Sequence, residues 1–302
     1  MVTSGSEGKA PFQGFETWYR VVGDLADHST EAPAPVVVLH GGPGGTHDYL
    51  VSMADLANQG RAVIFYDQLG NGRSTHLPDR GADFWTVQLF VEELANLLQH
   101  LGIAGRYHVL GQSWGGFLAQ EHALTQPVGL QSLVISNSAA SFPAFVREAD
   151  RLRQDLPVEV EATLRRHEAA GTTSDPEYRA ACQVFYQRHL CRLDPWPDAV
   201  RQGLDQIDVD PTVYHTMNGP SEFHVTGSIK DWSSESRLGN IRVPTLVVSG
   251  RFDEATPALQ TTLVDGIRGS HQRIFENSSH SPFWEERELY MAVIDEWLTA
   301  HD

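Results

Sequence analysis

The feature that most restricts how this chain can fold is a serine enclosed by glycines directly after an apolar run. The run Tyr107 to Leu110 leads into Gly111-Gln112-Ser113-Trp114-Gly115. In a G-x-S-x-G pattern a strand turns sharply into a helix, and the two glycines lack the Cβ atoms that would collide as the helix folds back. The pattern predicts that Ser113 projects above the end of a sheet as a nucleophile.

Apolar runs alternate with amphipathic segments in both ends of the chain. Continuous apolar runs are typical of strands covered on both faces, and such alternation predicts a mostly parallel central sheet with helices on both faces. Helical spacing follows several runs, as in His47 to Gln59, which Gly60 ends, and in Asp83 to Leu101. The predicted strands are 17–22, 36–39, 62–66, 107–110, 130–136, 243–249 and 273–275.

The pattern changes between Ser141 and Trp232, where charged amphipathic segments follow one another without a convincing strand. Prolines separate four candidate helices, which cover 144–155, 158–170, 176–190 and 198–206. We therefore expect a helical cap at residues 141–232, inserted between a first core segment at 1–140 and a second at 233–302.

Composition excludes several classes of protein. The 302 residues carry a formal charge of -17, which disfavours nucleic acid and anionic membrane surfaces as partners. The two cysteines lack paired metal spacing, and His167-Glu168 is not followed by the second histidine of H-E-x-x-H, so no metal or other cofactor is expected. The polar start and the lack of a long apolar run favour a cytoplasmic location, while nothing in the sequence indicates an oligomeric state.

Two polar loops follow predicted strands. The many glycines in His40-Gly41-Gly42-Pro43-Gly44-Gly45 indicate that another group approaches the backbone closely there. The loop Asp67 to Ser74 could suggest phosphate binding, but no helix with a Walker-type lysine opens from it. We interpret this second loop as a structural segment beside the site.

The chain order supplies partners for the serine. A serine nucleophile needs a base to remove its proton and a carboxylate to hold that base in the right tautomer. In Ser-Asp-His order the acid follows a later strand and the histidine comes last. Asp253 follows the run 243–249 and His280 follows 273–275, so Ser113, His280 and Asp253 are predicted as nucleophile, base and orienting acid.

A tetrahedral intermediate also needs two fixed N–H donors for its oxyanion. The backbone N–H of Trp114, directly after the nucleophile, is the first candidate. The second should come from the glycine loop after the strand 36–39, and we choose Gly42.

Taken together, these motifs resemble the proline iminopeptidase family of α/β-hydrolases. The resemblance covers the predicted core and the end of the cap, where Met217 to Phe223 and Gly227 to Trp232 are similar to the tricorn-interacting aminopeptidase factors of that family. It implies an α/β-hydrolase fold and a serine aminopeptidase that releases an N-terminal residue, proline or another small apolar one, from short peptides, amides or arylamides. It also implies that Glu222 and Glu254 bind the substrate amine.

Other functions stay open at this point. An amino-acid amidase or small-ester hydrolase would use the same triad and amine site, and a non-enzymatic ligand-binding protein can share this fold. Epoxide hydrolases and dehalogenases place an aspartate at the turn, so Ser113 argues against them. The resemblance leaves the preferred N-terminal residue and the leaving-group length undetermined.

Overall fold

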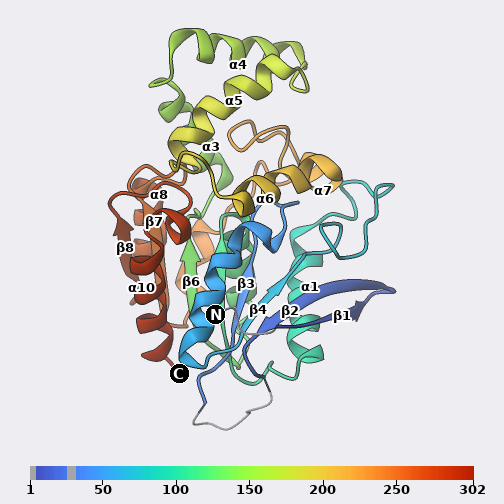
Figure 1. The fold of residues 1–302 in the computed structure, drawn as a ribbon, viewed down its shortest axis with the longest axis vertical. Helices are drawn as coiled ribbons and strands as arrows, with labels where there is room; N and C mark the ends of the chain where they lie inside the picture. The colour runs from blue at the N-terminus through green and yellow to red at the C-terminus, as the bar shows by residue number, and fades with distance from the viewer. Residues whose placement is uncertain (1–4, 26–31) are drawn as a thin grey trace.

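The computed structural model describes residues 5–25 and 32–302. Its centre is an eight-stranded sheet with the order β1-β2-β4-β3-β5-β6-β7-β8 (Figure 1). The pairs β1–β2 and β2–β4 are antiparallel, and all other neighbours are parallel. The strands are β1 (Ser6–Phe12), β2 (Phe15–Val22), β3 (Val36–Leu39), β4 (Val63–Tyr66), β5 (Tyr107–Gln112), β6 (Leu130–Ser136), β7 (Thr245–Gly250) and β8 (His271–Phe275).

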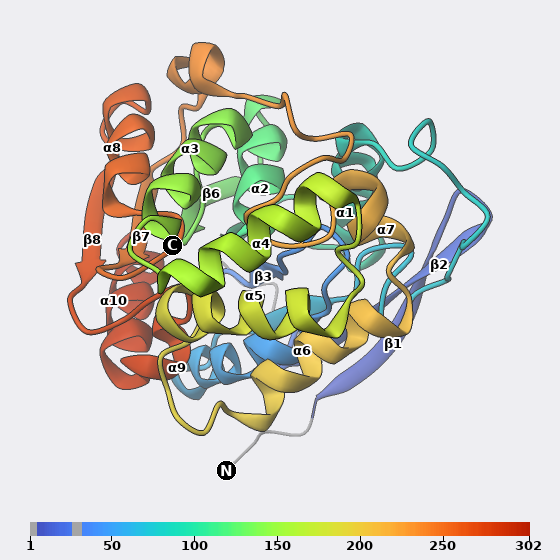
Figure 2. The same ribbon diagram turned by 90° about the horizontal axis from the view of Figure 1, so that it is seen from above.

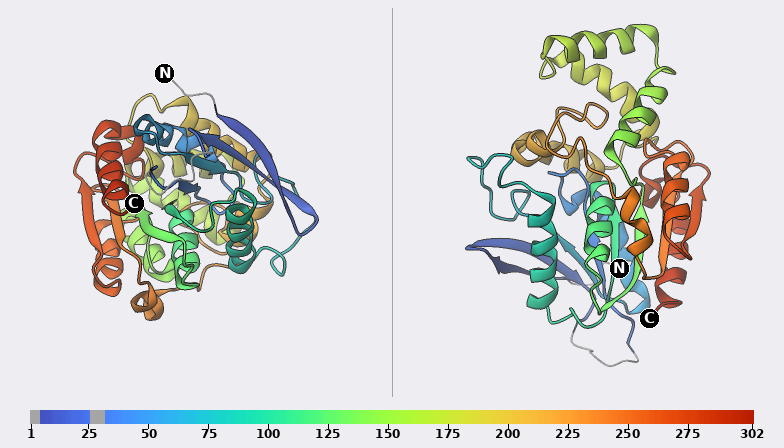
Figure 3. Two further views of the ribbon diagram at one scale, coloured as in Figure 1. Left: turned by 90° about the horizontal axis from the view of Figure 1, so that it is seen from below. Right: turned by 180° about the vertical axis from the view of Figure 1, so that it is seen from behind.

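Helices cover both faces of the sheet, as the continuous apolar strands predicted (Figure 3). Because side chains alternate along a strand, Val109 belongs to one apolar core and Leu110 to the other. The first core includes side chains of α1 (Val87–His100), α2 (Trp114–Leu124), η2 (Glu235–Asn240) and α8 (Pro257–Gly266). The second includes side chains of η1 (His47–Gln59), α9 (Pro282–Glu285) and α10 (Arg287–Thr299).

Five helices lie between β6 and η2 and stack over one end of the sheet, as the view from above shows (Figure 2). They are α3 (Phe142–Arg153), α4 (Val158–Ala170), α5 (Pro176–His189), α6 (Asp198–Val209) and α7 (Thr212–Met217). Residues 141–232 are all described and contribute no strand to the sheet. The division of the chain at residues 140 and 232 stays a prediction.

Two of the differences from the sequence analysis have a clear physical reason. The sequence analysis predicted no strand before residue 17, but β1 pairs with β2 through a two-residue turn at Gln13-Gly14, where both residues have positive φ. The segment η1 is a 3-10 helix. Its apolar side chains Leu50, Met53 and Leu56 recur at every third residue, which suits the three residues per turn of that helix.

Candidate active site

Ser113 lies on the turn between β5 and α2. Its backbone has φ +56° and ψ −124°, a conformation that costs energy for a residue with a side chain. A Cβ atom on Gly111 would lie 2.1 Å from the carbonyl oxygen of Gly115, and one on Gly115 would lie 2.1 Å from that of Leu39. The turn therefore requires glycine at both positions, which is what the sequence pattern indicated.

His280 and Asp253 meet at the carboxyl ends of the strands. The Nδ1 atom of His280 lies 2.6 Å from Oδ1 of Asp253, and both side chains are buried. The backbone N–H of Ala255 donates to the same Oδ1 at 2.9 Å, and the Asn137 amide donates to Oδ2 at 2.6 Å. His280 also lines one cavity together with Ser113. The structure thus brings the three residues of the predicted triad to one place.

The charges around His280 change its pKa. Burial lowers this pKa, but the charge and hydrogen bond of Asp253 and the charges of Glu254 and Glu222 together raise it to about 9. The ring of the free protein is therefore stabilised in its protonated form. A base in this position gains its neutral form when a cation offsets the surrounding carboxylates.

Gly42 and Trp114, the two predicted oxyanion donors, line a small cavity that also contains Ser113 and His280. Trp114 is the first residue of α2, so its N–H has no acceptor within the helix. Gly42 has φ +118°, and a Cβ atom there would lie 2.4 Å from the Gly44 nitrogen. The neighbouring N–H of Gly41 already donates to the Tyr49 hydroxyl at 2.6 Å, which leaves Gly42 as the better candidate.

Glu254 is fully buried next to His280, the predicted base. Its Oε1 atom lies 3.7 Å from Nε2 of His280, and neither carboxylate oxygen has a hydrogen-bond partner among the described residues. Burial raises the pKa of Glu254 well above its usual range, the charge of His280 opposes this, and the charges of Glu222 and Asp253 add to it. A buried carboxylate without a partner is suited to bind a cation, because the cation would supply the missing opposite charge.

Glu222 comes from the segment after α7 and faces the same cavities as Ser113. Its Oε1 atom accepts a hydrogen bond from the Tyr214 hydroxyl at 2.6 Å, and its backbone N–H donates weakly to Tyr186 at 3.4 Å. Burial raises the pKa of its carboxyl group, although the Tyr214 hydrogen bond lowers it. Two acids from distant segments therefore approach the predicted catalytic histidine.

A larger cavity of about 490 Å³ opens within the cap. It shares Leu204, Ile207 and Glu222 with the first cavity described above, which Ser113 and His280 line. Aromatic side chains of this helical region differ in whether they line a cavity or pack against one another. Phe142 and Phe145 line the small cavity at Ser113, and Tyr186 lines the large one. Phe223 packs against Phe185, and Trp232 packs edge-on against Phe117 and Phe142.

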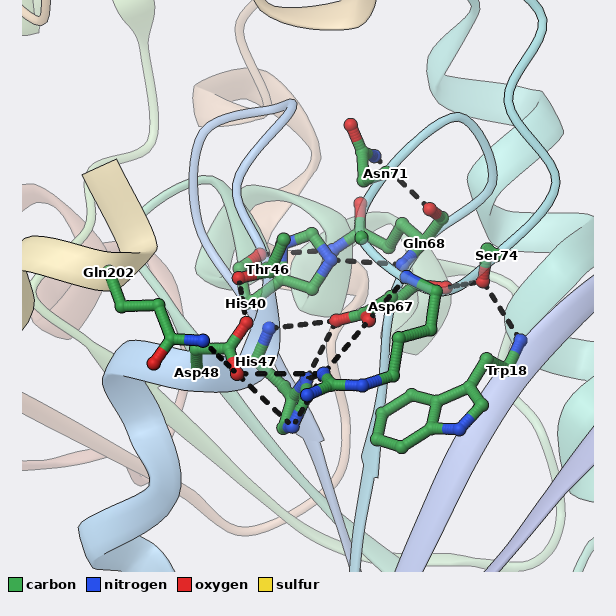
Figure 4. Close-up of polar contacts among 12 residues, drawn as sticks. Trp18, His40, Thr46, His47, Asp48, Asp67, Gln68, Asn71, Ser74 and Gln202 are labelled. Carbon is green, nitrogen blue, oxygen red and sulfur yellow. Dashed lines mark hydrogen bonds and ion pairs between the residues drawn. The ribbon is translucent and has the colours of Figure 1, made fainter. Parts of the chain in front are cut away.

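The loop Asp67 to Ser74 forms a polar network beside the glycine loop (Figure 4). The buried Asp67 carboxylate accepts hydrogen bonds from the backbone N–H groups of His47 at 3.0 Å and Arg73 at 2.9 Å, and lies 2.8 Å from Nδ1 of His47. The Ser74 hydroxyl links this loop to the backbone N–H of Trp18 at 2.8 Å. A buried carboxylate at the centre of the loop would repel a phosphate.

One cluster among the described residues has metal-ligating atoms within 4.8 Å of one another: His167, Asp175 and Glu177. Arg166 already pairs with Glu177 at 2.6 Å and lies 3.3 Å from Nε2 of His167. Because a guanidinium occupies the ligand atoms, this cluster is a poor cation site.

Sequence reasoning missed several residues that touch the site. Asn137 follows β6 directly, and Gln68 follows β4 after Asp67, so both stand where parallel strands end and ligands of such sheets bind. Their position directly after predicted strands could have identified these two residues as candidates for the site. Tyr49 and Tyr214 lie within helices, and no local pattern distinguishes them from core tyrosines.

The comparisons with known proteins agree with this geometry. Residues 34–287 match the family described as alpha/beta hydrolase fold, so the chain is an α/β-hydrolase. It is 39% identical over 299 residues to the proline iminopeptidase of Lactobacillus helveticus, covering 98% of both chains. The solved proline iminopeptidase of Mycobacterium smegmatis is 47% identical, with a TM-score of 0.90 and 98% of both chains covered. The chain therefore belongs to the proline iminopeptidase family.

A second solved structure, that of VinJ, is 51% identical with a TM-score of 0.95, covering 98% of this chain and 99% of that one. The predicted family and fold are both confirmed by these comparisons. No helix in the described part of the chain has the length and apolar character needed to cross a bilayer.

Proposed function

We propose that this protein is a serine aminopeptidase that releases an N-terminal residue, proline or another small apolar residue, through an acyl-enzyme. The main support for this substrate class is the buried Glu254 carboxylate, which has no hydrogen-bond partner within residues 5–25 and 32–302 and lies 3.7 Å from Nε2 of His280. Together with Glu222 it would bind the free ammonium of a substrate, because a buried charge needs an opposite charge to offset its desolvation.

In the mechanism that this arrangement supports, Ser113 Oγ attacks the carbonyl carbon of the first residue while His280 takes the serine proton. The oxyanion accepts hydrogen bonds from the N–H groups of Gly42 and Trp114. His280 then gives the proton to the leaving nitrogen, and the C–N bond breaks. Water then attacks the acyl-enzyme carbonyl and gives a proton to His280. His280 passes this proton to Ser113 Oγ as the ester C–O bond breaks, which releases the residue as a free amino acid and restores the serine hydroxyl.

The ammonium would also act on the base. The charges of Glu254 and Glu222 raise the pKa of His280, and a bound cation offsets them. The substrate that fits the two glutamates is therefore the substrate that makes His280 a competent base at neutral pH.

The large cavity in the cap favours a second candidate, an amino-acid amidase whose leaving group is bulky. Its volume of about 490 Å³ exceeds that of one amino acid, and aromatic side chains such as Tyr178, Tyr186 and Trp196 line it. Its two arginines are already paired: Arg179 with Asp208 at 3.2 Å, and Arg201 with Asp198. This lining suits a neutral apolar amine better than a leaving group that ends in a carboxylate.

The test compares substrates with and without a free amine. Prolyl arylamide, alanyl arylamide and prolinamide are assayed beside an N-acetylprolyl aryl ester, for the wild type and for Glu222→Gln and Glu254→Gln. We expect each substitution to raise KM for the free-amine substrates about tenfold or more, and to change KM of the ester little. Equal effects on both substrate types would refute the ammonium role. Preference for prolinamides with bulky apolar amines over prolyl dipeptides would favour the amidase.

A further inference from the structure

Gln68 joins the two segments that carry the proposed oxyanion donors. Its side chain is fully buried, and its Nε2 atom donates to the carbonyl oxygen of His40 at 3.0 Å. Its Oε1 atom accepts from the indole Nε1–H of Trp114 at 2.9 Å. A carbonyl oxygen only accepts and an indole N–H only donates, so these partners fix the orientation of the amide.

A second contact of Gln68 acts through a histidine ring (Figure 4). The backbone N–H of Gln68 donates to Nε2 of His40 at 2.9 Å, so the ring proton is on Nδ1. That Nδ1–H then donates to the carbonyl oxygen of Gly41 at 2.9 Å. This carbonyl belongs to the peptide whose N–H is that of Gly42. Burial lowers the pKa of His40 to about 4, so the ring stays neutral at physiological pH and keeps this arrangement.

The two donors come from segments that lie far apart in the chain. Gly42 stands in the loop after β3, and Trp114 begins the helix after β5. An oxyanion gains its stabilisation only when both N–H groups are fixed in advance at hydrogen-bond distance from one point. A displacement of about 1 Å can lower a rate by about 100-fold, so a connection between the two segments has a direct catalytic value.

We propose that Gln68 is a positioning residue of the oxyanion hole, holding the His40–Gly42 backbone and Trp114 in a fixed relation through its side-chain amide and its N–H. The inference rests on the proposed roles of Gly42 and Trp114. It also gives a function to the loop 67–74, which the sequence analysis regarded as a structural neighbour of the site. The loop serves the chemistry without touching the substrate.

The test uses Gln68→Leu, which keeps the approximate shape and removes both amide contacts. We expect kcat to fall about 10- to 100-fold with KM within about twofold, on both prolyl arylamide and the N-acetylprolyl aryl ester. The equal effect on both substrates separates this role from that of the amine site. Because the ester needs no ammonium, the measurement also stands if the aminopeptidase proposal fails.

Gln120→Leu is the matched control. Gln120 is also fully buried; its Nε2 donates to the Gly116 and Ala139 carbonyls at 3.0 and 2.9 Å, and its Oε1 accepts from Ser234 at 2.7 Å. We expect this variant to lose similar stability while kcat stays within about twofold of the wild type. If both glutamine variants change kcat equally, or if Gln68→Leu folds and keeps its kcat, the proposal is wrong.

Trp114→Phe provides the second variant in case Gln68→Leu does not fold. It removes the indole N–H that donates to Gln68, together with part of the ring volume, and keeps the backbone N–H at this position. We expect a smaller fall in kcat with unchanged KM. In the double variant the two losses should not add, because both break the same contact. Fully additive losses would show that Gln68 and Trp114 act separately and would overturn the proposal.

Discussion

The Oε1 atom of Glu254 lies 3.7 Å from Nε2 of His280, the ring nitrogen opposite the one that Asp253 holds. In a serine hydrolase Nε2 is the atom that takes the serine proton. In the free protein Glu254 thus faces the ring nitrogen that would take the serine proton if His280 is the base, as predicted.

This contact predicts the pH dependence of the reaction. The neutral ring is the active base, and the neighbouring carboxylates raise the pKa of His280 to about 9, so kcat/KM for an N-acetylprolyl aryl ester should rise with pH up to that region. Glu254→Gln removes one negative neighbour and should move this rise to lower pH. The measurement is the pH profile of kcat/KM for both proteins. Superimposable profiles would contradict the proposed electrostatic contact.

Glu254 should also reduce stability. A carboxyl group whose pKa is higher in the folded than in the unfolded state binds more protons when folded, so stability falls as the pH rises above about 4.5. We expect Glu254→Gln to increase the free energy of unfolding by about 1 kcal/mol or more at pH 8, and by less at pH 5. Urea unfolding at the two pH values measures this difference.

Glu222→Gln serves as the comparison for that measurement. Tyr214 already donates to the Glu222 carboxylate at 2.6 Å, so removing the charge of Glu222 should increase the free energy of unfolding less. If Glu254→Gln lowered the free energy of unfolding at either pH, the buried carboxylate would already be stabilised by its surroundings in the free protein.

The triad acid has a partner whose loss can be tested alone. The Asn137 amide donates to Oδ2 of Asp253 at 2.6 Å and weakly to the Ser279 carbonyl at 3.3 Å. Asn137 has φ +52°, which glycine adopts without strain, so Asn137→Gly removes the donor and keeps the backbone. We expect kcat to fall about tenfold with KM nearly unchanged, since a hydrogen bond to a charged group is worth about 1.5 to 3 kcal/mol. A lower melting temperature with the wild-type kcat would show that Asn137 only supports the fold.

The sharp turn at Ser113 and the helices α3 to α6 could be predicted because each depends on local patterns, whereas the catalytic roles of Ser113, Asp253 and His280 stay predictions. Glycine is required on both sides of Ser113 by contacts within a few residues, and Pro157 and Gly171 bound α4 where the sequence placed its ends. The strand β1 was not predicted, because only Ala10 and Phe12 of its residues are buried and an edge strand needs few apolar residues.

The contacts around the site were beyond a reading of one sequence. Gln68 meets His40 and Trp114 only because β4, β3 and β5 lie in that order in the sheet. Such pairings depend on the strand order and on side-chain directions, and neither is encoded in the spacing of residues along the chain. Motif positions predict which residues react, while the residues that hold them in place become visible only in the fold.

A buried arginine in the cap should control the position of Glu222. Arg153 at the end of α3 donates to Glu161 at 2.9 Å and to Glu168 at 3.0 Å, and its guanidinium lies 4.8 Å from the ring centre of Phe223. Lysine keeps the charge but lacks the planar fork and stacks less well on a ring. We expect Arg153→Lys to raise KM for prolyl arylamide several-fold while kcat changes less than about twofold.

The N-acetylprolyl ester separates this role from a general loosening of the cap. It does not need the amine site, so its KM should stay constant in Arg153→Lys, whereas a loosened cap would alter both substrates. Arg165→Met is the control, because Arg165 also pairs with Glu161, at 2.6 Å, but is exposed. An exposed pair of this kind contributes about 1 kcal/mol or less, so this variant should behave as the wild type on both substrates. If Arg165→Met raises KM for the arylamide as much as Arg153→Lys does, the stacking on Phe223 does not position Glu222.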